Sequence, residues 1–169
     1  NYVSEKTHRT KFVAVRYGNV LGSSGSVIPK FIELLKMRKP LPITDNTMTR
    51  FTMTSNEALE FILKATEIAK GSEIFIPKIN AYDMKILTSA LYELIEKTDE
   101  KIVGIRPGEK LHETLINPDE LQYAYEINDL YVILNPLIHP GTNSSPNMRN
   151  FSKEELDDRY PGIKKITNM

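Results

Sequence analysis

The chain of 169 residues contains no cysteine, and it has no net charge because 22 Lys and Arg residues balance 22 Asp and Glu residues. Without cysteine it has no disulfide scaffold, no cysteine-ligated zinc site and no cysteine nucleophile. A neutral chain also lacks the broad positive field typical of nucleic-acid-binding and polybasic membrane-binding proteins. We therefore expect no nucleic-acid partner, and any bound anion must be held by a few placed cations.

Long apolar runs and targeting signals are lacking as well. No run reaches the roughly 18 apolar residues of a membrane span, and the first residues show no signal-peptide pattern. We therefore expect no membrane contact in this chain and a cytoplasmic location, which the absence of cysteine also fits. The chain opens with Asn1 and not with Met, which we interpret as a cut within a longer polypeptide.

The glycine fingerprints of nucleotide-binding loops are the third absence. The sequence contains neither a G-x-G-x-x-G motif nor a P-loop. Gly18, Gly22 and Gly25 follow a strand-like run, but their spacing is different and they do not open directly into a helix. The sequence therefore predicts no dinucleotide site of its own.

The residues that are present are typical of a globular protein, with 40% hydrophobic and 26% charged residues. Strands are expected at residues 11–16, 73–79, 101–105 and 130–134, and helices at residues 29–37, 55–69, 84–95 and from 153 onward. This alternation indicates an α/β fold, although the strands are too few for a complete doubly wound sheet. We expect residues 1–134 to form the domain part and residues 135–169 a loop-rich tail with a short helix.

Three of the expected helices begin with a capping signal. Thr54 and Glu57 have the spacing of a capping box, and so do Ser152 and Glu155. Asp83 can cap the helix that follows it.

The first expected strand is nearly continuously apolar, as a buried parallel strand is. We expect this strand and the strand at 73–79 each to lack one neighbour in the sheet. Unpaired apolar edges favour association between chains. We therefore expect a homo-oligomer, and we expect the isolated chain to oligomerise or to be poorly soluble.

Two polar positions in the first half are candidates for ligand binding. Asn19 lies in the sequence RYGNVLG at residues 16–22, where a strand runs into a loop. Its amide can bond a ligand, or it can simply form a turn, and we interpret Arg16 as a structural ion-pair residue. Arg50, in the TRF sequence just before a capped helix, is either a solvated charge or a ligand contact.

The segment 105–113, IRPGEKLHE, has the strongest functional signal. A strand leads Arg106 into a Pro-Gly turn, and a guanidinium can form two parallel bonds to phosphate oxygens. Glu109 can accept from a diol such as a ribose. The alternative is a helix-capping turn with surface charges. We expect His112 to be a partly buried polar residue, because no second ligand stands at metal-binding spacing and we predict no metal site.

Together these segments resemble a known family. The sequences RYGNV (16–20), GSVIP (25–29), TRF (49–51) and GIRPGEKLHE (104–113) occur in the order seen in extended short-chain dehydrogenase/reductases. Up to about residue 135 the chain looks most like the UDP-N-acetylglucosamine 4,6-dehydratases of flagellin-sugar and capsule pathways. The resemblance implies the C-terminal portion of a Rossmann-like fold with its smaller substrate-binding subdomain.

In that family a Tyr-x-x-x-Lys pair deprotonates a hydroxyl group, and this chain contains two such pairs. Tyr2 and Lys6 are too close to the first strand for the long helix that the functional pair requires, so we interpret them as a coincidence. Tyr160 and Lys164 enclose a Pro-Gly pair and cannot be helical. The resemblance therefore places no catalytic residue in this chain.

The resemblance does imply substrate-binding roles. Asn19 would contact the nucleotide sugar, Arg50 and Arg106 the diphosphate, and Glu109 the uridine ribose. The uracil pocket would be lined by the segment 25–31, which includes Val27 and Pro29.

The implied enzyme is a lyase that converts UDP-N-acetylglucosamine to a 4-keto-6-deoxy sugar for surface glycans or glycoproteins. Its catalytic residues and its NADP would be held mainly by an upstream half, so that this chain alone is inactive. Two alternatives remain open. One is a UDP-sugar 4-epimerase, and the other is a non-catalytic module that binds nucleotide sugars.

Overall fold

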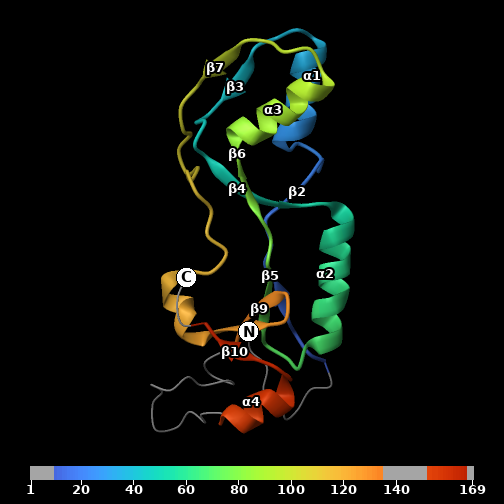
Figure 1. Ribbon diagram of the computed structural model, residues 1–169, viewed down its shortest axis with the longest axis vertical. Helices are drawn as coiled ribbons and strands as arrows, with labels where there is room; N and C mark the ends of the chain where they lie inside the picture. The colour runs from blue at the N-terminus through green and yellow to red at the C-terminus, as the bar shows by residue number, and fades with distance from the viewer. Residues whose placement is uncertain (1–9, 135–151, 167–169) are drawn as a thin grey trace. The chain divides into compact units, whose positions relative to one another are not determined.

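The computed structural model describes residues 10–134 and 152–166. It has the α/β fold class that the sequence predicts (Figure 1). Its contacts divide the chain into a first unit of residues 1–17, 59–78 and 115–169 and a second unit of residues 18–58 and 79–114. These units interleave along the sequence.

The first unit is built on a five-stranded sheet with the order β1-β5-β9-β8-β10. The strands are β1 (Ala14–Val15), β5 (Ile74–Pro77), β8 (Ala124–Ile127), β9 (Leu130–Ile133) and β10 (Lys164–Lys165). Only β1 and β5 pair in parallel, and the other pairs are antiparallel. The strands expected at 11–16, 73–79 and 130–134 are confirmed in shorter form, whereas β8 and β10 were not predicted.

The expectation of two edge strands is half correct. Among the described residues β1 pairs only with β5, so it is an edge strand. The expectation is wrong for β5, which pairs with β1 on one side and with β9 on the other. The first strand is also less buried than its apolar sequence predicts, because Ala14 and Val15 are half-buried and Phe12 is 55% exposed.

The core of the first unit contains an apolar cluster. Ile76, Ile116, Ala124 and Ile133 form the apolar cluster. The short 3-10 helix η1 (Pro118–Tyr123) precedes β8.

Arg16 reaches η1 through a bidentate ion pair, since its Nη1 and Nη2 donate to the two carboxylate oxygens of Glu120 at 2.7 and 2.8 Å. The interpretation of Arg16 as a structural ion-pair residue is therefore confirmed.

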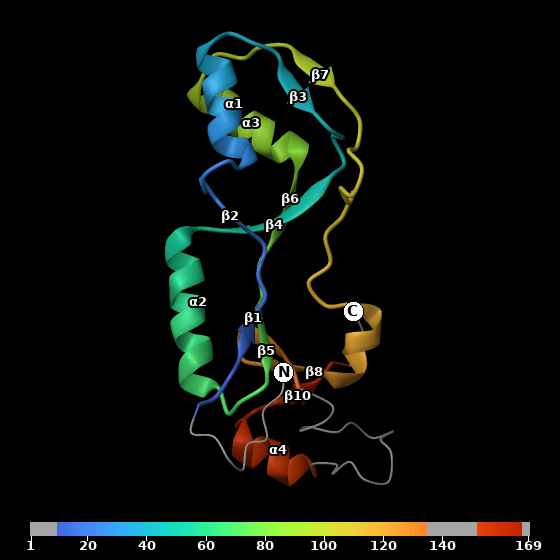
Figure 2. The ribbon, with the colours of Figure 1, turned by 180° about the vertical axis from the view of Figure 1, so that it is seen from behind.

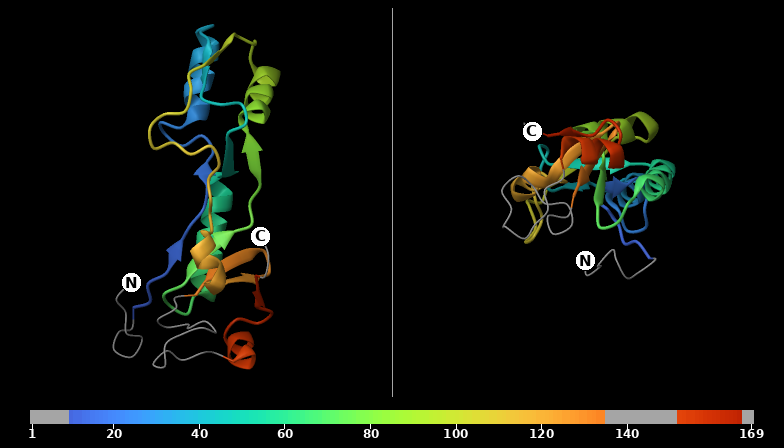
Figure 3. Two further views of the ribbon diagram at one scale, coloured as in Figure 1. Left: turned by 90° about the vertical axis from the view of Figure 1, so that its left-hand side faces the viewer. Right: turned by 90° about the horizontal axis from the view of Figure 1, so that it is seen from below.

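The C-terminal segment packs onto the same unit. The helix α4 (Lys153–Arg159) begins with the predicted capping box of Ser152 and Glu155. Figure 3 shows β10, which follows α4, beside the hairpin of β8 and β9. The predicted short helix is thus confirmed, and the turn after Tyr160 is not helical, as its Pro-Gly pair predicts.

The second unit has two small sheets and two helices. One sheet has the order β2-β4-β6, and the other pairs β3 with β7. These elements are β2 (Asn19–Val20), β3 (Leu41–Ile43), β4 (Thr49–Met53), β6 (Ala81–Asp83), β7 (Glu100–Ile102), α1 (Val27–Lys36) and α3 (Met84–Leu94). The two helices and the strand β7 correspond to the predictions at 29–37, 84–95 and 101–105.

The helices α1 and α3 lie next to each other (Figure 2), and their apolar side chains pack in one cluster. Phe31 and Leu35 from α1 pack with Leu87 and Leu91 from α3, and β3 adds Leu41 and Ile43. This cluster fixes the orientation of α1.

A close approach of two strands requires glycine at position 18. A Cβ atom at Gly18 would lie 2.3 Å from the carbonyl oxygen of Phe51 in β4. No side chain fits at that distance, so Gly18 allows β2 to pair with β4. The expected loop after the first strand is therefore wrong at Asn19, which is part of β2.

The helix α2 (Ser55–Ile68) starts as its capping box predicts. The backbone N–H of Thr54 donates to Oε2 of Glu57 at 2.6 Å, and the backbone N–H of Glu57 donates to Oγ1 of Thr54 at 3.2 Å. Across the described residues, no helix is both long enough and apolar enough to cross a membrane.

Candidate functional site

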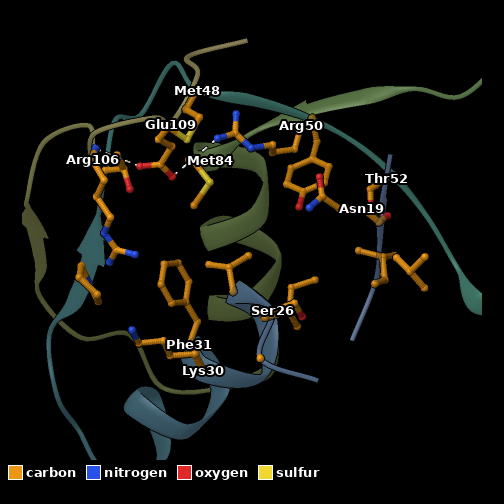
Figure 4. Close-up of a pocket in the computed structure, with 18 residues that line it drawn as sticks. Asn19, Ser26, Lys30, Phe31, Met48, Arg50, Thr52, Met84, Arg106 and Glu109 are labelled. Atoms are coloured by element: carbon orange, nitrogen blue, oxygen red, sulfur yellow. Dashed lines mark hydrogen bonds and ion pairs between the residues drawn. The ribbon is translucent and has the colours of Figure 1, made fainter. Parts of the chain in front are cut away.

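A pocket of about 290 Å³ lies wholly within the second unit (Figure 4). Its walls come from β2, the first turn of α1, β4, β6 and the loop that follows β7. The polar and charged lining residues are Asn19, Ser26, Lys30, Thr44, Arg50, Thr52, Tyr82, Arg106 and Glu109. The structure therefore brings together Asn19, Arg50, Arg106 and Glu109, four residues that the sequence singled out from distant segments.

Arg50 is held firmly at the wall of the pocket. Its Nη1 donates to the carbonyl oxygens of Thr49 at 2.8 Å and of Leu111 at 3.3 Å. Its Nη2 lies 3.7 Å from Oε1 of Glu109, and the side chain is only 15% exposed. Arg50 thus fixes the position of Glu109 and retains donor capacity toward the pocket, since a guanidinium has five N–H groups.

Arg106 is placed by a tight turn that ends at Glu109. The backbone N–H of Glu109 donates to the Arg106 carbonyl at 3.0 Å, and the backbone N–H of Arg106 donates to Oε2 of Glu109 at 3.2 Å. Gly108 has a φ of 83°, which glycine adopts at little cost. The Arg106 side chain is exposed and has no partner among the described residues, so it is available to an anion.

Asn19 presents its side chain at the edge of the pocket. Its backbone carbonyl accepts from Oγ1 of Thr52 at 3.1 Å, which holds the residue in β2. Its amide group has no hydrogen-bond partner among the described residues and is exposed. A strand position, rather than a turn, therefore aims the Asn19 amide.

The N-terminus of α1 faces the pocket without a cap. Ser26 is the N-cap residue, but its side chain forms no capping bond. The oxygen of a serine cap accepts a hydrogen bond from the N–H of the second or third helical residue, and the third residue here is Pro29, which has no N–H. Oγ of Ser26 is buried without a partner, and the N–H groups of Val27 and Ile28 have no partner among the described residues.

The two residues expected to line a uracil pocket behave differently. Val27 lines the pocket, whereas Pro29 is not one of the lining residues. Pro29 has no backbone N–H and therefore cannot donate to Ser26 at the N-terminus of α1. Sequence reasoning did not single out Lys30, which lines the pocket one residue further along α1.

Tyr82 adds a hydroxyl group to the pocket wall. Burial raises the pKa of Tyr82, and the nearby charge of Arg50 partly opposes that rise. The hydroxyl therefore stays protonated at neutral pH and can donate a hydrogen bond to a ligand.

His112 does not take part in the pocket. Its Nδ1 lies 2.8 Å from Oγ1 of Thr49, and the residue is exposed, so the expectation of a partly buried histidine is wrong. His112 pairs with Thr49 at the surface, where the two residues also form an isolated parallel β-bridge. Within the described ranges no group of three His, Asp or Glu residues could hold a metal ion.

The fold and the pocket together define a class. The chain has the α/β fold of extended short-chain dehydrogenase/reductases, and its pocket presents cationic and amide groups suited to a phosphorylated ligand. Residues 1–135 match the family of polysaccharide biosynthesis proteins, and the chain belongs to that family.

Curated relatives carry two enzyme names. The chain is 46% identical over 126 residues to a UDP-N-acetylglucosamine 4,6-dehydratase (inverting) of Campylobacter jejuni, a match that covers 74% of this chain and 37% of that enzyme. It is 38% identical over 125 residues to a UDP-glucose 4-epimerase of Rickettsia massiliae, covering 73% of this chain and 37% of that enzyme. The match thus spans little more than a third of each relative.

A solved structure supports the same fold. The X-ray structure of Pen from Bacillus thuringiensis superposes with a TM-score of 0.74 at 38% identity, and the superposition covers 92% of this chain and 50% of that one. The expected fold class and the expected family resemblance are therefore both confirmed.

Proposed function

We propose that the pocket of the second unit binds the UDP part of a nucleotide sugar, and that the chain is the substrate-binding part of a UDP-N-acetylglucosamine 4,6-dehydratase. The observation that carries this proposal is the convergence of Arg106 with the uncapped first turn of α1 on one pocket. Free N–H groups at a helix N-terminus and a guanidinium are both favourable partners for phosphate oxygens. The identity to the Campylobacter jejuni dehydratase supports the choice of substrate.

Each part of the ligand has a suitable partner. The diphosphate would lie against Arg106 and the first turn of α1, with Arg50 beside it. Glu109 would accept from the ribose hydroxyls, because Arg50 holds its carboxylate in place. Asn19 would contact the sugar, and Val27 would contact the uracil.

The chemical contribution of these residues is positioning. Holding the UDP group at fixed points orients the sugar for reaction, which removes much of the entropic barrier. The net reaction of a 4,6-dehydratase is the loss of water across C5 and C6, which leaves a 4-keto-6-deoxy sugar.

The residues present do not fit a dinucleotide cofactor, because the chain contains no glycine-rich phosphate-binding turn. NADP would therefore be bound outside these residues. We accordingly propose no catalytic residue in this chain. We also propose that the enzyme is a homo-oligomer.

Binding of UDP-N-acetylglucosamine to this chain, measured by calorimetry, tests the proposal. We expect saturable binding that UDP displaces and uridine displaces only weakly, because phosphate contacts supply most of the affinity. Absence of binding at millimolar ligand would contradict the proposed function. We also expect no sugar turnover by this chain when NADP is added.

A 4-epimerase is the second candidate, and the 38% identity to the Rickettsia massiliae enzyme favours it. The two candidates predict different products from the enzyme that contains this chain. A dehydratase releases water and forms a keto sugar, whereas an epimerase leaves the mass of the sugar unchanged. Mass spectrometry of the product separates them.

A further inference from the structure

The charges that line the pocket do not cancel. Four charged side chains line it: Lys30, Arg50, Arg106 and Glu109. Arg50 and Glu109 lie 3.7 Å apart and compensate each other. Lys30 and Arg106 have no ion-pair partner among the described residues, so the pocket retains two uncompensated positive charges.

Lys30 is the fourth residue of α1 and lies one turn into the helix. It therefore stands on the same helix end as the free N–H groups of Val27 and Ile28. Phe31, the next residue, is buried in the core and fixes the rotation of the helix. In Figure 4 the side chains of Lys30 and Arg106 extend from different elements along the same side of the pocket.

We propose that Lys30 is a diphosphate-binding residue, which together with Arg106 balances the two negative charges of a nucleotide-diphosphate sugar. This inference rests on the proposed function of the pocket. A sugar ester of a nucleoside diphosphate has one ionised oxygen on each of its two phosphates, and the pocket has one free cation for each. The flexible stem of lysine lets its ammonium group follow a phosphate as a point charge.

Replacing Lys30 by Met tests this role, because Met keeps the length of the side chain and suits a helix. We expect Lys30→Met to weaken UDP-N-acetylglucosamine binding about tenfold, in line with the loss of one charge-assisted hydrogen bond. The salt dependence of binding should also weaken, since one of two screened attractions is gone. The affinity for uridine, which has no phosphate, should stay unchanged.

Lys36→Met is the matched control. Lys36 lies on the same helix and does not line the pocket, so its loss should leave both affinities unchanged. If Lys30→Met binds the sugar nucleotide as the wild type does, or if it weakens uridine equally, the inference is wrong. If the wild type itself binds no UDP-N-acetylglucosamine, the proposed function fails before the role of Lys30 is reached.

Discussion

Arg106 and Arg50 differ in how their charge is used, although both line the pocket. Arg50 donates to two backbone carbonyls and faces Glu109, whereas the Arg106 side chain has no partner among the described residues. A side chain that forms hydrogen bonds within the fold contributes to stability. A side chain without such hydrogen bonds can be replaced with little effect on stability. The two arginines should therefore respond differently to substitution.

If the chain belongs to the proposed UDP-sugar enzyme, we expect Arg106→Ala to raise the KM of that enzyme for the UDP-sugar by about 10- to 150-fold. This range corresponds to charge-assisted bonds of about 1.5–3 kcal/mol. Arg106→Lys should restore only part of the loss, because lysine cannot form two parallel bonds. Steady-state kinetics with each variant measure the effect.

Thermal unfolding provides the control for Arg106. The melting temperature should hardly change, since the side chain is exposed and makes no contact that the fold needs. Arg38→Ala, which removes an exposed arginine paired with Glu96 outside the pocket, should leave the KM unchanged. A large fall in melting temperature with an unchanged KM would show that Arg106 is structural.

The ion pair of Arg16 and Glu120 makes a pH-dependent contribution to stability. The hydrogen bond from Arg16 lowers the pKa of Glu120 in the folded chain. A carboxylate with a depressed folded pKa stabilises the fold above its unfolded pKa of about 4.3, and this stability is lost as the pH falls through the folded pKa. The effect should be modest because both side chains are partly exposed.

Chemical denaturation of Glu120→Gln between pH 7 and pH 3 tests this contribution. We expect the variant to be less stable than the wild type at pH 7 and the difference to shrink as the pH falls below about 4. Glu113→Gln serves as the comparison, because Glu113 is an exposed carboxylate and is not the partner of Arg16. A difference that stays constant with pH would mean that the charge of Glu120 is unimportant.

At the scale of elements, the pairing of β2 with β4 depends on a missing side chain. Gly18→Ala places a Cβ atom against the backbone of Phe51, where nothing flexible can move away. We expect a loss of about 1–3 kcal/mol in the free energy of unfolding, the range for overpacked sites. Urea denaturation measures it.

Binding should fall together with stability in Gly18→Ala, because β2 positions Asn19 at the pocket. Ser24→Ala changes an exposed residue in the loop that follows β2 and should have neither effect. If Gly18→Ala were as stable as the wild type, the close approach of the two strands would not be a constraint on the fold.

Local signals explain which elements could be predicted from the sequence. The starts of α2 and α4 were predicted correctly because each capping box lies within four residues. The strands β2 and β6 were missed because they have two and three residues, and their pairing with β4 depends on contacts distant in sequence, such as Asn19 with Thr52. The 3.6-residue periodicity of α1 was visible in the sequence, but it did not show that Lys30 lines the pocket.

The candidate site was predictable in composition and not in geometry. The resemblance of the motifs to those of a known family implied that Asn19, Arg50, Arg106 and Glu109 bind one ligand. It could not show that Arg50 lies 3.7 Å from Glu109 as an ion pair, because 59 positions separate them in the sequence. It also could not show that Pro29, by lacking an N–H, leaves the helix end open.

At the scale of the whole molecule, the two units differ in what they contain. The pocket belongs entirely to the second unit. The first unit holds a fully buried carboxylate, Glu73, which accepts from the Gly71 N–H at 2.7 Å and from the hydroxyl of Tyr160. Tyr160 follows α4, so this contact attaches the C-terminal segment to the start of β5.

Burial and the charge of Glu73 raise the pKa of Tyr160 well above its usual range, so its hydroxyl remains a donor at any ordinary pH. Tyr160→Phe would remove one of the donors to the buried carboxylate of Glu73, whose Oε1 also accepts from the backbone N–H of Lys70 at 3.0 Å. We expect this to lower the free energy of unfolding by about 1–3 kcal/mol and to make the C-terminal segment more sensitive to limited proteolysis. Thermal unfolding and timed trypsin digestion measure the two effects.

Tyr160→Phe should nevertheless leave the affinity for UDP-N-acetylglucosamine unchanged, since no residue of the first unit lines the pocket. Tyr123→Phe is the matched control, because the Tyr123 hydroxyl has no hydrogen bond to any described residue and its loss should change neither stability nor binding. If Tyr160→Phe weakened binding at a temperature where the protein is still folded, the two units would be coupled. A stable Tyr160→Phe variant with an unaltered digestion pattern would show instead that the C-terminal segment is held by β10 alone.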